Sequence, residues 1–307
     1  MPTPTTCRIC NGRLALIQRG NGSTYEPSVF SPSYHRSGAH GDLYRCVDCR
    51  TVHQSCAPRG SDLHDRYRAM SDARYLQEEE GRRRHARRLL DVLEPHVPRG
   101  CLLDVGCGYG LLLDEARRRG YEVEGVELSA DAARHARETL GLPVRELALE
   151  DDALAQALGS ERYDAVLAID VLEHFDDPVL ALDRLHALLA PGGALLIVTP
   201  DPTSVTARVA GSRWWCYEPA HICLIPRRKV HELLHERGLA VERDIPLVHT
   251  FSLGYWLAGL SESSGPAKGA IAYVAERLPR KLLLTASLRD DRVLLARHST
   301  NGARVPS

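Results

Sequence analysis

The stretch that decides the fold is Leu102-Leu103-Asp104-Val105-Gly106-Cys107-Gly108-Tyr109-Gly110, in which three glycines alternate with other residues after a short apolar run. An amphipathic segment, residues 111–119, follows and ends at Gly120. This order of strand, glycine turn and helix lets the backbone approach a ligand at the carboxyl end of the strand, where ligands of open α/β sheets bind. The dinucleotide fingerprint would need a third glycine at Leu111, so a pyrophosphate ligand is disfavoured.

Apolar strands and amphipathic helices alternate around this turn. Such repeated βα units form a parallel sheet that is covered on both faces. The sequence therefore predicts an α/β chain with a Rossmann-like, doubly wound, mostly parallel sheet. The pattern predicts strands at 101–105, 122–127, 163–170, 194–199, 239–245 and 293–297, and helices at 72–93, 111–119, 130–140, 178–190, 226–237 and, as one or two, within 253–278.

A carboxylate follows each of the first two strands. Asp104 closes the first and can lie beside a cationic group, and Glu127 closes the second, where it can accept both hydroxyls of a ribose. The pair suits a ligand with a ribose and a positively charged amino-acid tail but without a pyrophosphate. S-adenosylmethionine fits that description.

Four motifs in this order resemble class I S-adenosylmethionine-dependent methyltransferases, and the likeness is greatest to the branch that includes ubiquinone-pathway O-methyltransferases. They are the glycine turn, Glu127, the segment 163–178 and Pro191-Gly192-Gly193. The resemblance implies a seven-stranded sheet and an adenine contact at Leu149 or Glu150. It implies that the cofactor is bound by Tyr75, Asp104, Gly106, Cys107, Gly108, Gly110, Glu127, Leu128, Asp170 and Val171.

Two cysteine pairs, Cys7-x-x-Cys10 and Cys46-x-x-Cys49, lie in a segment that is too polar to form its own core. Four thiolates at this spacing make a closed tetrahedral zinc site, whose binding energy can replace a core. A structural Zn²⁺ in a zinc-ribbon-like module is therefore expected rather than a catalytic one, with a redox pair or free thiols as alternatives. The insertion between the pairs contains Tyr25, Phe30, Tyr34 and His35, which could form a lid or substrate surface.

These patterns predict that the chain divides into three parts. Residues 1–60 form the zinc-binding module, 61–98 a helical linker and cofactor lid, and 99–307 the methyltransferase domain. Substrate-cap insertions are expected around 203–225 and 250–280. Tyr67 and Tyr75, near the linker helix, resemble tyrosines that fold over the cofactor, although plain packing is an equal alternative.

Methyl transfer from a sulfonium needs aligned reactants, exclusion of water and, for a hydroxyl acceptor, a base. Histidine is the natural base near pH 7. The first catalytic candidate is His221, in an aromatic loop, and the second is His174, after the fourth strand, for which a structural hydrogen bond is the alternative. Trp214, Trp215 and Tyr217 are expected either to wall the acceptor pocket or to pack under the loop.

The composition limits the functions further. A net charge of −1 with 44% apolar and 26% charged residues is ordinary for a globular chain, and no apolar run approaches the ~18 residues of a membrane helix. The start of the chain lacks a secretory signal, so a cytoplasmic location is expected.

The resulting prediction is an S-adenosylmethionine-dependent methyltransferase that acts on a small molecule of a biosynthetic pathway, such as a natural product or a sugar. An oxygen acceptor is favoured. An RNA methyltransferase with a zinc ribbon is the first alternative, although the near-neutral charge argues against nucleic acid. A non-catalytic, zinc-dependent interaction scaffold is the second, and the intact glycine turn with Glu127 argues against it.

Overall fold

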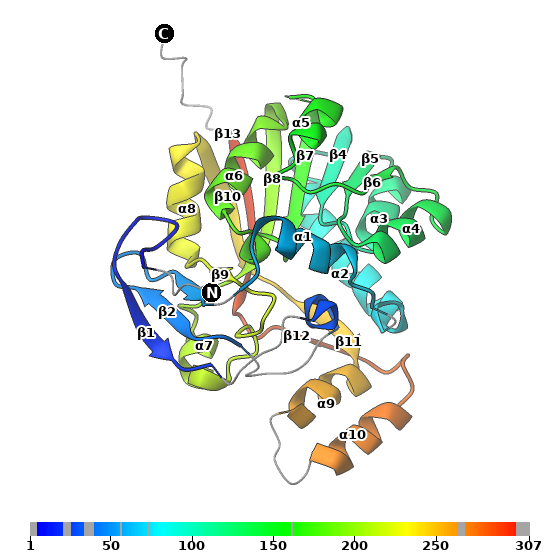
Figure 1. Ribbon diagram of the computed structural model, residues 1–307. Helices are drawn as coiled ribbons and strands as arrows, with labels where there is room; N and C mark the ends of the chain where they lie inside the picture. The colour runs from blue at the N-terminus through cyan, green and yellow to red at the C-terminus, as the bar shows by residue number, and fades with distance from the viewer. Residues whose placement is uncertain are drawn as a thin grey trace.

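The computed structural model describes residues 5–20, 26–33, 40–55, 57–72, 74–160, 162–262 and 268–298, and a seven-stranded sheet lies at its centre (Figure 1). The strand order is β10-β13-β8-β7-β4-β5-β6. All neighbours pair in parallel except β13, which is antiparallel to β8 and β10. The predicted mostly parallel α/β sheet is thus confirmed. Its strands are β4 (Cys101–Val105), β5 (Glu122–Val126), β6 (Val144–Arg145), β7 (Tyr163–Ile169), β8 (Leu189–Pro200), β10 (Leu239–Pro246) and β13 (Asp291–His298).

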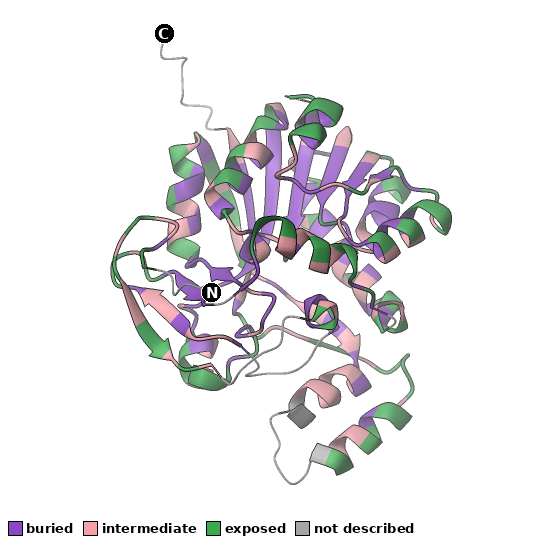
Figure 2. Ribbon diagram, in the orientation of Figure 1, coloured by how far each residue is buried: buried purple, intermediate pink, exposed green. Residues whose placement is uncertain are grey.

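Helices cover both faces of this sheet, and alternate strand residues form the two cores. Leu103 and Val166 face α5 (Asp152–Leu158), α6 (Pro178–Ala187) and α8 (Arg227–Glu236). Leu102 and Leu167 face α2 (Glu79–Leu93), α3 (Leu111–Arg118) and α4 (Ala130–Glu138). Figure 2 shows the central strands buried along most of their length.

The cysteine pairs belong to a second, antiparallel sheet of order β1-β2-β3-β9. Its strands are β1 (Leu14–Gln18), β2 (Leu43–Cys46), β3 (Val52–Gln54) and β9 (Cys223–Leu224). The structure agrees with the prediction that this segment is too polar to form its own core, because its Leu43 and Val52 pack against Trp214 and Leu224. Residues far along the chain supply the missing apolar surface.

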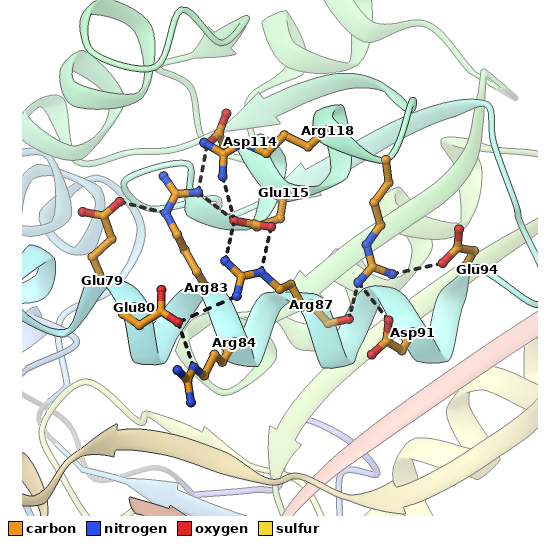
Figure 3. A network of polar contacts seen from close by, with 11 residues as sticks. Glu79, Glu80, Arg83, Arg84, Arg87, Asp91, Glu94, Asp114, Glu115 and Arg118 are labelled. Carbon is orange, nitrogen blue, oxygen red and sulfur yellow. Dashed lines mark hydrogen bonds and ion pairs between the residues drawn. The ribbon is translucent and has the colours of Figure 1, made fainter. Parts of the chain in front are cut away.

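The segment between the two sheets contains α1 (Gly60–Arg68), the 3₁₀ turn η2 (Tyr75–Glu78) and α2. The helix predicted at 72–93 therefore begins later, at Glu79. Figure 3 shows how α2 is fixed to α3: Arg83 contacts Asp114 at 2.8 Å and Glu115 at 3.0 Å. These buried ion pairs hold η2 and α2 beside the glycine turn.

Both segments predicted as substrate caps contain helices, and the one or two helices predicted within 253–278 are confirmed as two. Residues 203–225 include α7 (Val205–Ala210) and the 3₁₀ turn η4 (Gly211–Arg213). The segment predicted at 253–278 contains two helices, α9 (Leu253–Glu262) and α10 (Lys268–Arg277), between the paired strands β11 (His249–Ser252) and β12 (Leu283–Ala286). None of the helices in the described ranges is both long and apolar enough to cross a membrane.

Of the residues expected to form a lid between the cysteine pairs, Phe30 ends the 3₁₀ turn η1 (Pro27–Phe30) and is buried in the main core. Its ring packs edge-on against Tyr67, with 4.9 Å between the centroids. Tyr25, Tyr34 and His35 lie outside the described residues.

Candidate functional site

A cavity of about 800 Å³ opens at the carboxyl edge of the main sheet, where β4, β5 and β7 end. It brings together almost all of the residues predicted for the site. The lining includes Tyr75, Asp104, Gly106, Cys107, Gly108, Glu127, Leu128, Asp170, Val171, His174 and His221. Gly110 is the exception, since it is not part of the lining.

The glycine turn is shaped by positions that no other residue could fill without strain. Gly106 has a φ of 74°, and a Cβ there would lie 2.6 Å from Val171 Cγ2. Gly110 has a φ of 81° at the start of α3, and its Cβ would lie 2.9 Å from that of Ala136 on α4. Gly106 therefore keeps the cavity floor open, and Gly110 sets the packing of α3 against α4.

The two predicted carboxylates lie on this floor. Glu127 accepts hydrogen bonds from the amides of Gly108 at 2.8 Å and Ser129 at 2.7 Å. Asp104 is only 3% exposed, and its Oδ1 has no hydrogen-bond partner among the described residues. Burial, with Glu127 nearby, raises the pKa of Asp104 to about 8. A buried, unpartnered carboxylate oxygen fits a cationic group of a ligand.

Aromatic side chains close the cavity above the glycine turn. Tyr75 stacks on Tyr109 with 4.7 Å between the ring centroids, and the Arg82 guanidinium lies 3.8 Å from the centroid of Tyr75. Leu149 and Glu150, the two predicted adenine contacts, also line the cavity.

The two candidate histidines face each other with 4.9 Å between their ring centroids. His221 Nδ1 lies 2.9 Å from the carbonyl oxygen of Cys216, so this nitrogen carries the proton and donates it. His174 Nδ1 lies 2.9 Å from the carbonyl of Ala220 and 2.8 Å from the hydroxyl of Tyr67. Burial lowers the pKa of His221 to about 3 and that of His174 to about 4, which keeps both rings neutral at pH 7.

Two carboxylates adjoin His221. Its Nε2 lies 3.1 Å from Glu218 Oε1 and 3.9 Å from Glu173 Oε1. Glu173 is 1% exposed, its backbone carbonyl accepts from the amide of Ile222, and its Oε2 accepts from Thr199 Oγ1 at 2.9 Å. Burial raises the pKa of both carboxyls. The two histidines thus lie in one cluster with the carboxyl groups of Glu173 and Glu218.

The aromatic loop combines both roles proposed for it. Trp215 lines the cavity. Trp214 is fully buried, its Nε1 donates to Asp290 Oδ2 at 2.8 Å, and Tyr217 packs edge-on against it. Only Trp215 walls the pocket, while Trp214 and Tyr217 form the core under the loop.

Comparison with known proteins identifies the family of the chain. A family profile described as "Methyltransferase domain" matches residues 76–243, more than half of the chain. The chain belongs to this methyltransferase family. The match runs from η2, over the cavity, through the sheet to β10.

Curated relatives are methyltransferases as well. A ubiquinone biosynthesis O-methyltransferase of Cereibacter sphaeroides is 34% identical over 155 residues, which covers 45% of this chain and 59% of that protein. An uncharacterized methyltransferase of Mycobacterium tuberculosis is 39% identical over 111 residues, covering 35% and 55%. The chain thus spans less than two thirds of the length of these relatives. A Thermotoga maritima S-adenosylmethionine-dependent methyltransferase, described as a possible histamine N-methyltransferase, superposes with a TM-score of 0.49 and 17% identity over 74% of this chain and 93% of that one.

Several residues of this methyltransferase-family cavity were not singled out from the sequence. Glu173 precedes His174 directly, and Glu218 lies three residues before His221, so their spacing from the candidate histidines was a usable signal. His249, Phe251 and Asp291 also line the cavity. They come from β11 and β13, and no motif marks them.

The cysteine pairs form two equivalent turns beside the methyltransferase-family domain. Asn11 and Arg50, directly after each pair, have φ values of 59° and 67°. The Sγ atoms of Cys7 and Cys49 lie 3.5 Å apart, as do those of Cys10 and Cys46, and all four lie within 4.8 Å of one another. Tetrahedral zinc with bonds of about 2.3 Å would place its sulfurs about 3.8 Å apart, so the cluster fits one ion.

Proposed function

We propose that the protein transfers a methyl group from S-adenosylmethionine to a small-molecule acceptor. The observation that carries the proposal is the unpartnered Oδ1 of Asp104, which lies buried on the floor of a cavity that also contains Glu127 and His221. One end of the cavity offers a carboxylate for a cationic amino acid, and the other offers histidines to an acceptor. Family membership supports the same reaction.

In this proposal the cofactor-binding residues contact different parts of S-adenosylmethionine. Asp104 and the amides of the glycine turn hold the amino-acid portion, and Asp170 lies under the same tail. Glu127 accepts the ribose hydroxyls, Tyr75 and Val171 enclose the sulfonium side, and Leu128 with Leu149 or Glu150 borders the adenine. The charge of Asp104 is restored when the cation binds, because a cation within hydrogen-bond reach lowers the pKa of a carboxyl.

The chemical step needs little more than alignment and removal of a proton. The acceptor O–H bond breaks, and its proton passes to the base, for which His221 is the first choice and His174 the second. The acceptor oxygen forms a bond to the methyl carbon while the carbon–sulfur bond of the sulfonium breaks. The products are the methyl ether and S-adenosylhomocysteine. The sulfonium loses its positive charge in this step, and that charge moves with the proton to the base.

The acceptor end of the cavity supports a flat, largely apolar substrate. Phe251 stacks on Tyr255 with 4.3 Å between ring centroids, and both line the cavity with Trp215 and Trp256. Aromatic walls of this kind bury planar molecules well. We therefore favour a polyketide-like aromatic metabolite over a sugar or peptide-derived one, within a biosynthetic pathway.

A structural zinc in the module of residues 1–60 is the second part of the proposal. The Nε2 of the buried His53 lies 3.2 Å from Cys7 Sγ and can donate to a thiolate. The purified protein should carry zinc that is lost when Cys7, Cys10, Cys46 and Cys49 are all changed to Ser. Cys101→Ser is the matched control, since Cys101 lies outside the cluster. Zinc retained by the quadruple variant would overturn the assignment.

The test of the main proposal is binding and turnover together. Calorimetry should give a micromolar affinity for S-adenosylhomocysteine, and S-adenosylmethionine should be consumed with phenolic acceptors but not with RNA. Turnover with RNA alone would favour the RNA methyltransferase alternative. A protein that binds no cofactor would favour the alternative of a non-catalytic, zinc-dependent interaction scaffold.

A further inference from the structure

We infer that Glu78 is a positioning residue that couples the cofactor end of the cavity to its acceptor end. It ends η2, three residues after Tyr75, and its side chain contacts the acceptor cap. The acceptor cap is the part of the cavity wall formed by β11, α9, α10 and β12, residues 249–262 and 268–286. The inference rests on the proposed function, because it concerns what a bound cofactor does to the acceptor side.

The carboxylate of Glu78 is buried, and both of its oxygens accept hydrogen bonds from the cap. Oε2 accepts from the backbone amide of Ser252 at 2.7 Å, and Oε1 accepts from Ser252 Oγ at 2.7 Å. Arg280 Nη1 donates to the same Oε1 at 2.9 Å. Glu78 is 3% exposed and Ser252 is inaccessible. Charge-assisted hydrogen bonds in a buried place are costly to break, so Glu78 holds Ser252 in one position.

The position of Ser252 decides where the acceptor wall lies, because Ser252 joins β11 to α9. Its Oγ accepts from the amide of Tyr255, in the first turn of α9, at 3.1 Å. Phe251 precedes Ser252 and stacks on Tyr255, and both rings line the cavity. Glu78 therefore fixes the residue that lies between the two aromatic rings of the acceptor wall.

The other end of η2 lies over the cofactor end of the cavity. The hydroxyl of Tyr75 lies close to the glycine turn, since a Cβ on Gly108 would be 3.6 Å from it. The turn η2 has only four residues, and side chains three residues apart in a 3₁₀ turn project from the same side. A ligand that moves or fixes Tyr75 therefore moves or fixes Glu78 with it.

Helix α2 carries two further contacts between the same parts of the molecule. The Arg82 guanidinium lies 3.8 Å from the centroid of Tyr75 and 5.4 Å from that of Phe251, so it contacts one ring at each end of the cavity. One turn further on, Arg88 Nη1 donates to Thr250 Oγ1 of β11 at 2.5 Å. These contacts keep α2 against the cap, while Glu78 connects the cap to η2.

A cofactor that holds Tyr75 in place should therefore order the acceptor cap as well. Coupling between two binding sites is reciprocal, so an acceptor bound against the cap should strengthen cofactor binding to the same degree. Methyl transfer needs both reactants aligned and water excluded. Glu78 serves this need through Tyr75 and Ser252, without contacting either reactant.

Hydrogen exchange followed by mass spectrometry tests the coupling without any acceptor. The full-length protein is compared with and without saturating S-adenosylhomocysteine. In the wild type the ligand should slow exchange by ~5-fold or more at the glycine turn and also at residues 249–258, which is the lower end of ordinary coupling between sites. In Glu78→Ala the glycine turn should keep this response and residues 249–258 should lose it. Glu78→Gln, which keeps an acceptor oxygen for the Ser252 amide, should restore most of it.

A matched variant and the free proteins complete the test. Glu80→Ala removes an exposed carboxylate two residues further on, paired with Arg84, and should respond like the wild type. In free Glu78→Ala, residues 249–258 should still exchange more slowly than an unstructured peptide, because β11 pairs with β12.

Three results would overturn the inference. They are a full response of residues 249–258 in Glu78→Ala, exchange of these residues in the free variant at the rate of an unstructured peptide, and a wild type in which only the glycine turn responds. A wild type in which neither segment responds would contradict the proposed cofactor, and the inference with it. The response of the glycine turn thus separates failure of the coupling from failure of the proposed function.

Discussion

The side-chain amide of Gln54 donates a hydrogen bond to the backbone carbonyl of Pro219 at 3.0 Å. The same nitrogen lies 3.2 Å from the carbonyl of Glu218 and 3.4 Å from that of His221, and Gln54 Oε1 accepts from the amide of Gly41 at 2.7 Å. Gln54 ends β3 of the cysteine module, and β3 pairs with β9, directly after this loop. The module thus fixes the backbone of the segment that carries the candidate acceptor-side residues.

Replacing this amide should loosen the acceptor side of the cavity only. In Gln54→Ala the buried carbonyl of Pro219 and the part-buried carbonyls of Glu218 and His221 lose a shared donor, which should lower the free energy of unfolding by ~1–3 kcal/mol. We expect an increase of about tenfold in the KM for the acceptor, with S-adenosylhomocysteine affinity within about twofold of the wild type. Denaturant unfolding, calorimetry and steady-state kinetics measure the three quantities. Gln77→Ala, which removes an exposed contact to Arg280, is the control; equal effects in both variants would contradict the role of Gln54.

The buried arginine on α2 should matter more for stability than its exposed neighbour. Arg83 contacts Asp114 and Glu115, both nearly inaccessible, whereas Arg84 forms an ion pair with the exposed Glu80 (Figure 3). Arg83→Met should lower the free energy of unfolding by ~1.5–3 kcal/mol, because hydrogen bonds to charged groups are lost. Arg84→Met should change it by less than ~1 kcal/mol. Urea unfolding of both variants checks this; equal values would mean that the network does not hold α2 to α3.

The carboxylate at the end of β5 should control cofactor affinity. Glu127→Ala removes an acceptor proposed for the ribose hydroxyls and also the partner of the Gly108 amide. We expect S-adenosylhomocysteine to bind ~10-fold or more weakly, because a charge-assisted hydrogen bond contributes ~1.5–3 kcal/mol. Glu122→Ala, at the exposed start of the same strand, should bind normally. If calorimetry gives an unchanged affinity for Glu127→Ala, Glu127 does not bind the ribose hydroxyls.

The main fold and one end of the cavity could be predicted from the sequence because their signals are local. The glycine turn, Glu127 and Asp170 each follow a strand that its apolar residues predict. The carboxyl ends of parallel strands meet at one edge of the sheet, so these residues were expected to lie together. The acceptor end could not be predicted, because it depends on long-range packing. The pairing of β3 with β9 and the burial of Trp214 beside Asp290 join segments that share no pattern. His249 and Asp291 reach the cavity for the same reason.

Cofactor binding should release a proton at neutral pH. The pKa of Asp104 is raised to about 8 by burial in the free protein, so most of this carboxyl is protonated at pH 7. A cationic amino group bound there would require the carboxylate. Affinity should therefore rise by up to tenfold per pH unit between pH 6 and pH 8 and then level off. Calorimetry in buffers of different ionisation enthalpy measures the released proton. Asp104→Asn should abolish the release, and a wild type that binds without releasing one would contradict the pairing.

His221 should be needed for turnover but not for cofactor binding. It lies at the acceptor end of the cavity, 3.1 Å from Glu218 and 3.9 Å from Glu173, while Glu127 and the glycine turn lie at the cofactor end. His221→Ala removes the first candidate for the base that takes the proton of the acceptor. Turnover should fall by ~10²–10⁴-fold. The affinity for S-adenosylmethionine should stay within about twofold of the wild type, which calorimetry measures.

The matched variant is His174→Ala, which also removes a buried imidazole from the same cluster but breaks the contacts with Tyr67 and Ala220. Tyr67→Phe measures the loss of the Tyr67 contact by itself, since it deletes only the hydroxyl beside His174. If His174 serves mainly to position its neighbours, His174→Ala should lower stability and retain more turnover than His221→Ala. The opposite order would exchange the two roles. Wild-type turnover in both variants would mean that alignment and exclusion of water alone drive the transfer, as expected for an acceptor that is already a strong nucleophile.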